Sequence, residues 1–151
     1  MGFWGGGISS NEKKGANMVK MTKQLSVFLE NRPGALTQIC NILAEVNVNV
    51  LALSVHDTVD HAIVRLVADQ YIKALLLLEQ QGLYIQEQDV VVVSLDNHPG
   101  RLAKLTQKLA HADINIAYAY CTAMENQVEG CLVLKTDDPE RTLELLRDRP
   151  A

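Results

Sequence analysis

The stretch that decides the fold of this chain is Leu29-Glu30-Asn31-Arg32-Pro33-Gly34-Ala35-Leu36. Apolar side chains alternate with others over residues 24–30, which is the pattern of a strand with one face on a core. Over 36–46 they recur at helical spacing instead. Between the two patterns, Pro33 suits the first position of a helix, and Gly34 lets a ligand or a backbone approach closely. The stretch is therefore a strand-to-helix turn.

The same turn recurs later in the chain as Leu95-Asp96-Asn97-His98-Pro99-Gly100-Arg101-Leu102. The Asn, Pro, Gly and second Leu keep their places, so the repeat predicts two copies of one supersecondary unit. We expect a flexible leader over 1–22, a first module over 23–89 and a second over 90–151. Modules this small bury little core alone. They should pack against each other or against another chain. The interface between the modules, which we call the seam, is therefore the expected functional surface.

Each module reads strand, helix, strand, strand, helix. In the first module the predicted elements are 24–30, 36–46, 50–55, 62–68 and 71–81, with a short closing strand over 83–88. In the second they are 90–95, 100–112, 116–121, 130–136 and 139–147. This order folds most simply as an antiparallel sheet with both helices on one face, the ferredoxin-like βαββαβ arrangement of the α+β class.

The second module lacks a closing strand of its own, so its first strand would lie uncovered at a sheet edge. We expect the N-terminal leader, the link at 86–89 or another subunit to cover that edge.

Composition limits the functions that are open to the chain. It is 48% apolar and 21% charged with a net charge of -4, which is typical of globular proteins and argues against nucleic acid as a partner. The sequence predicts neither a membrane span nor a secretory signal, so we expect a cytoplasmic protein. Three cysteines at irregular spacings fit neither a disulfide framework nor a zinc site. We interpret Cys40 and Cys131 as small buried hydrophobes and expect no metal and no cofactor.

The run Glu30-Asn31-Arg32-Pro33-Gly34, with Val48-Asn49-Val50 downstream, resembles the ACT domain, a ferredoxin-like module that binds small metabolites, usually amino acids, and regulates enzymes. The resemblance covers residues 23–147, which match the ACT domain once in each module. It is strongest to the serine-binding regulatory domain of phosphoglycerate dehydrogenase, and 25–31 is also similar to the regulatory subunit of acetolactate synthase. As a whole, the chain is most similar to stand-alone proteins made of two ACT modules.

In the serine-binding family, the turn Asn and the Asn that opens the second strand hold the effector across an interface between two modules. The resemblance assigns these roles to Asn31 with Asn49, and to Asn97 with Asn115. That family has a His two residues before the turn Asn, where this chain has Leu29 and Leu95. Serine is therefore in question, and a larger or less polar amino acid fits better if these side chains face the site.

These residue types suit a free amino acid, because the unpaired N–H groups that open a helix bind a carboxylate and an Asn amide both donates and accepts. The expected ligand-binding residues are Asn31, Arg32, Pro33, Gly34, Ala35, Leu36, Asn49, Asn97, His98, Pro99, Gly100, Arg101, Leu102 and Asn115. The alternative is that the four Asn residues only complete local turns. For the flanking charged side chains the alternative is solvation at the surface. Tyr118 and Tyr120 either shape the seam or simply pack.

No catalytic constellation or phosphate loop is recognisable, so we do not expect an enzyme. The sequence predicts a non-catalytic, allosteric regulatory protein that binds an amino acid between its modules. Its expected partners are a second copy of itself, in a dimer, and an amino-acid biosynthetic enzyme. The alternative is a ligand-independent regulatory or structural subunit that binds a metabolic enzyme. A single-stranded RNA binder shares the topology but needs aromatics on the central strands, where only Phe28 is suitably placed.

Overall fold

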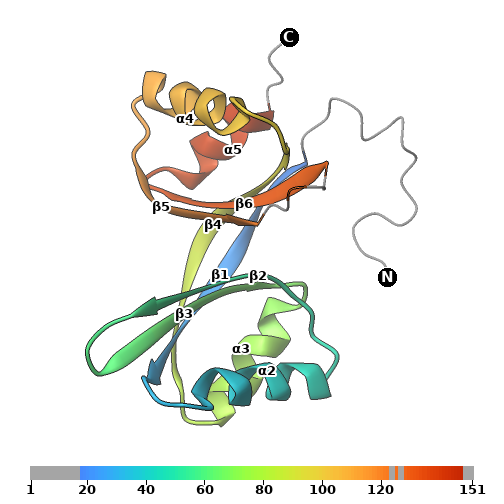
Figure 1. Cartoon of the computed structure of the whole chain (residues 1–151), viewed down its shortest axis with the longest axis vertical. Coiled ribbons are helices and arrows are strands. Elements are labelled where there is room, and N and C mark those ends of the chain that lie inside the picture. Colours follow the sequence, from blue (N-terminus) through green and yellow to red (C-terminus); the bar gives the residue numbers. More distant parts are fainter. Residues whose placement is uncertain (1–17, 123–124, 126–127, 148–151) are drawn as a thin grey trace.

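The computed structural model describes residues 18–122, 125 and 128–147 of the chain. Within them, six strands form one antiparallel sheet in the order β2-β3-β1-β4-β6-β5 (Figure 1). The strands are β1 (Val19–Glu30), β2 (Val50–Asp57), β3 (His61–Ala68), β4 (Tyr84–Asp96), β5 (Ile116–Thr122) and β6 (Glu129–Thr136). The helices are α2 (Ala35–Glu45), α3 (Tyr71–Gln80), α4 (Arg101–His111) and α5 (Pro139–Arg147). The predicted order of strands and helices is confirmed, and with it the tandem ferredoxin-like fold.

Two long strands, β1 and β4, run through both modules. β4 joins the predicted closing strand of the first module and the predicted first strand of the second into one strand of 13 residues. Residues 25–28 of β1 pair with 84–87, and residues 19–23 pair with 89–93. The start of β1 therefore takes the place of the closing strand that the second module was expected to lack.

Of the three expected covers for that edge, the N-terminal segment is the one that the structure shows. The strand begins at Val19, so it overlaps the end of the leader expected over 1–22, whereas residues 1–17 lie outside the described part. The division into modules at 23–89 and 90–151 stays a prediction, since β1 and β4 each cross one of these boundaries.

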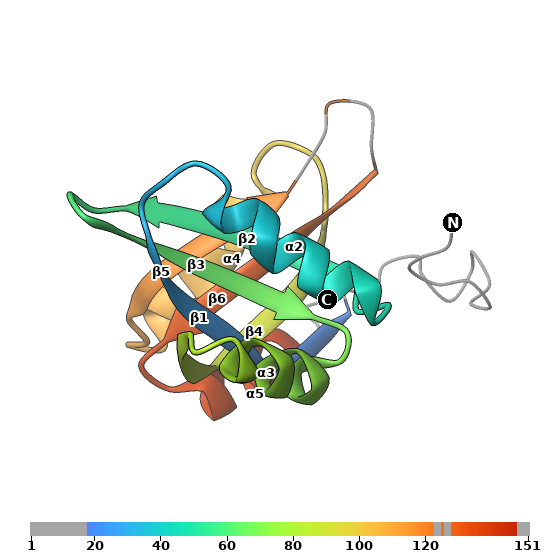
Figure 2. The ribbon, with the colours of Figure 1, turned by 90° about the horizontal axis from the view of Figure 1, so that it is seen from below.

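The sheet curls so that its two halves face each other, with α2 and α3 outside one half and α4 and α5 outside the other (Figures 1 and 2). As a result, alternate side chains of β1 point to opposite faces of the curled sheet. Leu25 and Leu29 belong to the core beneath α2 and α3, and Val19 packs against the core beneath α4 and α5. Gln24 and Ser26 point to the opposite, concave face, where they are 0% and 3% exposed.

A third core fills the space between the two halves of the sheet. Its residues are Ala52, Val67, Val90, Val92, Cys131 and Val133, with Leu51 and Tyr120 packed against them. All three cysteines are free thiols and Cys131 is buried, as predicted, but the prediction for Cys40 was wrong because that side chain is exposed. Helix α2 buries only a narrow face, Ala35, Ile39 and Leu43, and Cys40 lies beside it. None of the described helices has the length and apolarity needed to cross a membrane.

Candidate functional site

The two Pro-Gly turns have the same backbone geometry. Gly34 and Gly100 precede α2 and α4 with φ of 87° and 90°, the left-handed region that favours glycine. A Cβ added to either would meet nothing within 4 Å, so the backbone conformation, not crowding, requires glycine. Pro33 lies before the helix instead of at its first position, because α2 begins at Ala35. The N–H groups of Ala35 and Arg101 donate to the carbonyls of Arg32 and His98 at 3.3 and 3.4 Å. The donors that the sequence predicted for a carboxylate are therefore the N–H groups of the residues that follow in each first turn.

Asn31 ties the first turn to the hairpin between β2 and β3. Its side-chain Nδ2 donates to Oδ1 of Asp57 and, at 3.4 Å, to the carbonyl of Thr58. Its backbone N–H donates to the carbonyl of Asp60 at 3.2 Å. In the second module, the backbone N–H of Asn97 donates to Val128 at 2.7 Å, in the hairpin between β5 and β6.

The Asn residues that open β2 and β5 are each held by an aspartate that follows the neighbouring strand. The backbone N–H of Asn49 donates to Oδ1 of Asp69 at 3.0 Å, and that of Asn115 donates to Oδ1 of Asp137 at 3.1 Å. Each aspartate N–H returns a hydrogen bond to the Asn carbonyl, at 3.0 and 3.1 Å respectively. Among the described residues, neither Asn side-chain amide takes part in these bonds. The backbone is fixed while both amides stay available to a ligand.

The structure separates the two Asn residues of one module. Asn31 precedes α2 and Asn49 follows it, and a helix of 11 residues spans about 16 Å. One amino acid therefore cannot contact both Asn residues of the same module. The predicted sharing of a ligand requires a turn from one module and a strand-opening Asn from another.

The other predicted residues lie around the two turns. Nε of Arg32 is 4.0 Å from Oε2 of Glu30, and Nε of Arg101 is 3.8 Å from Oδ2 of Asp96, so each arginine has a carboxylate beside it. The remaining predicted residues differ in exposure: Pro33, Gly34, His98, Pro99, Gly100 and Leu102 are exposed, Leu36 is half-buried and Ala35 is buried. Leu29 is 7% exposed within the core beneath α2 and α3, and therefore does not line an open site.

A second polar group, which we call the seam cluster, lies on the concave face between the two halves of the sheet. Its residues are Gln24, Ser26, Arg65, Gln88, Tyr118 and Tyr120. Nε2 of Gln24 is 2.9 Å from Oε1 of Gln88 and 2.7 Å from the hydroxyl of Tyr118. The hydroxyls of Ser26 and Tyr118 donate to Oε1 of Gln88 at 2.9 and 3.0 Å. The hydroxyl of Tyr120 donates to Oε1 of Gln24 at 2.8 Å.

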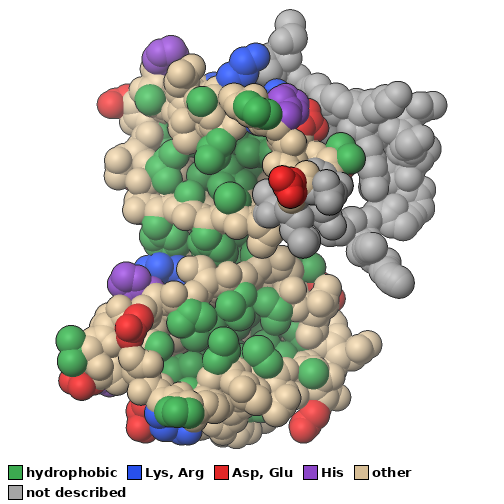
Figure 3. Space-filling view, viewed as in Figure 1, with side chains coloured by type: hydrophobic (Ala, Val, Ile, Leu, Met, Phe, Trp, Pro, Cys, Tyr) green, Lys and Arg blue, Asp and Glu red, His purple; other side chains and the backbone are tan. Residues whose placement is uncertain are grey.

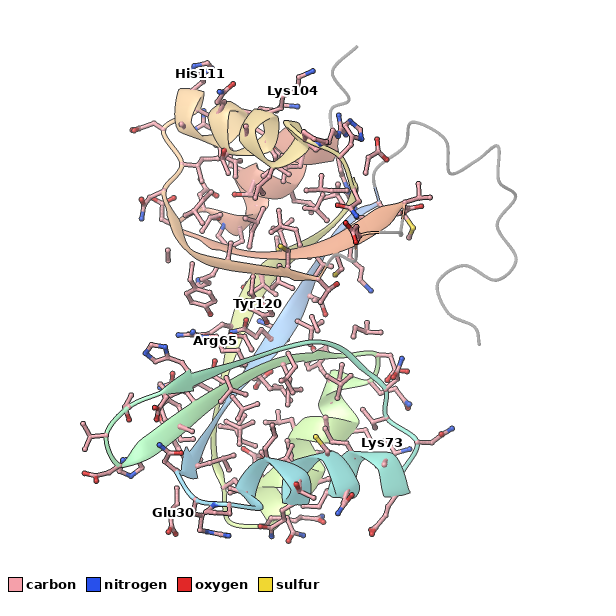
Figure 4. The ribbon with its side chains drawn as sticks, viewed as in Figure 1. Glu30, Arg65, Lys73, Lys104, His111 and Tyr120 are labelled. Atoms are coloured by element: carbon pink, nitrogen blue, oxygen red, sulfur yellow. The ribbon has the colours of Figure 1, made fainter. Side chains whose placement is uncertain are left out.

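Electrostatics in the seam cluster follow from burial and from one cation. Burial raises the pKa of Tyr120 above its usual range, Tyr118 adds to that effect, and Arg65 opposes it. Cζ of Arg65 lies 4.0 Å from the ring centroid of Tyr118, which is cation–π geometry. Figure 4 labels Arg65 and Tyr120 between the two halves of the sheet.

Sequence reasoning noted the two tyrosines but missed the other members of the seam cluster. A signal was present, because Gln24 and Ser26 occupy every second position of a strand whose other positions are apolar. The aspartates Asp69 and Asp137 were also missed, although each follows the third strand of its module. Nowhere in the described part do three or more His, Cys, Asp or Glu side chains gather in a way that could hold a metal ion.

Comparison with known proteins agrees with this architecture. A family described as "ACT domain pair" matches residues 20–149. Protein BT0572 from Bacteroides thetaiotaomicron is 32% identical, with a TM-score of 0.80 over 86% of this chain and 89% of that one. The regulatory subunits of aspartate kinase from Thermus thermophilus and Thermus flavus are 17% and 19% identical. Their TM-scores are 0.64 and 0.62, covering 88% and 87% of this chain and 97% and 92% of theirs. No curated protein matches.

Proposed function

We propose a function for this chain on the premise that it belongs to the ACT domain pair family. It is a non-catalytic regulatory protein whose ligand is a free amino acid, bound between a turn of one module and a strand-opening Asn of another. The observation that carries this proposal is the duplication at Asn49 and Asn115. In both modules an aspartate holds the Asn backbone and leaves the side-chain amide unbonded among the described residues.

The chemistry of a free amino acid matches the parts of this arrangement. Its carboxylate accepts from the N–H groups that open α2 or α4, where the helix dipole also favours negative charge. Its ammonium donates to the amide oxygen of Asn49 or Asn115. Because about 16 Å of helix separates the two Asn residues of one module, each site needs a second module, and in a dimer a second copy of the chain supplies it. Dimerisation and ligand binding are then linked.

The regulated partner that fits best is an enzyme of amino-acid biosynthesis. Solved structures with this fold include proteins described as regulatory subunits of aspartate kinase, although at 17% and 19% identity they support only the fold. The chain would act on such an enzyme through the difference between its ligand-bound and ligand-free states. Cytoplasmic residence stays a prediction.

A second function has one observation in its favour. The side-chain amide of Asn31 already donates to Asp57 and to Thr58, so at this turn the Asn stabilises the hairpin. A ligand-independent subunit that binds a metabolic enzyme needs Asn31 only for this structural role. The two functions differ in whether the isolated protein binds an amino acid.

A thermal-shift screen against the twenty amino acids, followed by calorimetric titration of any that stabilise the protein, tests the proposal. Replacing both Asn49 and Asn115 by Ala removes a charge-assisted hydrogen bond at each site and should weaken binding about tenfold or more. Asn41→Ala, at an exposed position of α2, is the matched control and should bind as the unmodified protein does.

Two results would contradict the proposal. If no amino acid stabilises the protein at millimolar concentration, the ligand-independent subunit is the better function. If an amino acid binds but the double Asn variant binds it unchanged, the ligand lies elsewhere.

A further inference from the structure

We propose that Arg65 is the anion-binding residue of a further small-molecule site, in the seam between the two halves of the sheet, and that it binds a carboxylate. The inference rests on the proposed function only for the class of ligand, which is a free amino acid. It differs in place, because Arg65 lies on the concave face of the sheet, whereas the Pro-Gly turns lie at the starts of α2 and α4.

The position of Arg65 is fixed by three strands. In β3 it pairs with Ser26 of β1 on one side and with Ser54 of β2 on the other. Directly paired residues share a face of the sheet, so these hydroxyls flank the base of the arginine side chain. At its far end the guanidinium lies 4.0 Å from the ring centroid of Tyr118, which comes from the facing half. The guanidinium is thus held before any ligand arrives.

Arg65 has an N–H donor without a partner. Its Nε is buried and has no hydrogen-bond partner among the described residues, and none of the ion pairs found there includes Arg65. A buried donor without a partner is unfavourable, so Nε of Arg65 favours the approach of an acceptor. A carboxylate is the matching acceptor, because its two oxygens take two parallel N–H donors of a guanidinium.

The surroundings favour an anion over a cation. The seam cluster contains amides, hydroxyls and a guanidinium but no carboxylate, and its hydroxyls bond to Gln24 and Gln88 instead of to Arg65. Nε2 of Gln88 is a further donor that bonds to nothing in the described part of the chain. Ala52 and Val67, on the same face, belong to the third core and are 5% and 1% exposed, so they do not line an open site.

Arg65 is half-buried and lies in β3, next to the end strand β2. β2 and β5 are the end strands of the sheet order, so they approach each other without a hydrogen-bonded ladder between them. A ligand that reaches Arg65 between these strands therefore breaks no backbone pairing. Figure 4 labels Arg65 between the two halves of the sheet, and Figure 3, in the same view, shows cationic atoms at the surface there.

The test follows the Nε–H signal of Arg65 by nitrogen-15 NMR in the full chain, assigned as the resonance missing from Arg65→Lys. The probes are the twenty amino acids, sodium acetate, and sodium chloride as a control for ionic strength. We expect a saturable shift of this signal with at least one amino acid and with acetate, but not with chloride. Calorimetric affinity for that amino acid should fall about tenfold or more in Arg65→Met and also fall in Arg65→Lys, which keeps the charge but loses the planar fork.

The matched control is Lys104→Met, which removes one positive charge from the outside of α4, where Figure 4 labels it. It should bind as the unmodified protein does. The inference is overturned if no amino acid and no acetate moves the Arg65 signal saturably. It is also overturned if folded Arg65→Lys and Arg65→Met bind with unchanged affinity.

Two further outcomes separate this inference from the proposed function. Binding that depends on Asn49 and Asn115 but not on Arg65 overturns the inference and supports the proposed function. Saturable binding of acetate at Arg65 without any response to an amino acid supports the carboxylate site and contradicts the amino-acid function.

Discussion

The hydroxyl of Tyr120 donates a 2.8 Å hydrogen bond to Oε1 of Gln24, across 96 positions of the sequence. The bond joins β5, at one end of the sheet, to β1 in its middle. Gln24 is 0% exposed, so its amide oxygen depends on partners within the protein. The two modules are therefore connected through a buried polar contact as well as through the shared strands β1 and β4.

Replacing Tyr120 by Phe removes this donor and leaves a buried amide oxygen with one partner fewer. The expected loss is about 1–3 kcal/mol in the free energy of unfolding, measured by urea denaturation. The matched control is Tyr84→Phe, whose hydroxyl accepts from Gln86 at 3.1 Å on a side chain that is 62% exposed. The control should change stability by no more than about 0.5 kcal/mol. Equal losses in both variants would show that the seam contact contributes nothing specific.

Burial of Tyr120 also predicts how stability depends on alkaline pH. Burial disfavours the phenolate, so the pKa of Tyr120 in the folded protein lies above the ordinary value of 10.0. The unfolded chain therefore releases this proton first, and the free energy of unfolding falls as pH rises above about 10. Below that value the contribution is fully present. Tyr120→Phe should lose less stability than the unmodified protein between about pH 9 and pH 11, by up to about 1.4 kcal/mol per pH unit. Parallel urea-denaturation curves for the two proteins over that range would contradict the prediction.

Those parts of the fold were predictable whose sequence signal lies within a few neighbouring residues. The alternation over 24–30, the Pro-Gly turns and the opening of α5 are local, and their elements appear where expected. At that helix, Asp138 caps the backbone N–H of Arg141 at 3.1 Å. The continuity of β4 was missed because four polar residues, 86–89, precede the apolar run and indicated a link between modules. In the structure, Lys23 pairs with Asp89 at 2.8 Å, across the strand pair that serves both modules.

The functional sites were predictable only in part, for the same reason. Repetition alone identified both turns and both strand-opening Asn residues. The seam cluster depends on the curl of the sheet, which turns the polar side of β1 toward β5, and no pattern within β1 specifies that curl. A lone Arg65 in an apolar strand therefore gave no sign that Tyr118 of the other module would lie over it.

The N-terminal part of β1 should stabilise the second module. Removing residues 1–22 deletes the strand partner of residues 90–93 and leaves an open edge on β4. We expect a marked loss of stability in urea denaturation, and self-association detected by light scattering. Removing only residues 1–17 keeps that pairing intact and is the control. The role assigned to this segment would be wrong if both truncated proteins were monomeric and equally stable.

The left-handed turns give a prediction that separates backbone strain from packing. Gly34 has a φ of 87°, and a Cβ added there would meet nothing within 4 Å, so substitution is opposed by conformation alone. Gly34→Ala should cost about 1 kcal/mol in the free energy of unfolding, because other residues in this region are disfavoured by about 1–2 kcal/mol and alanine stiffens the unfolded chain slightly. Gly34→Asn should cost less, since Asn visits the left-handed region more readily. The same pair at Gly100, with a φ of 90°, should behave alike. Urea denaturation of the four variants checks this, and an Asn variant less stable than its Ala counterpart would show that steric contact, not φ, governs the turn.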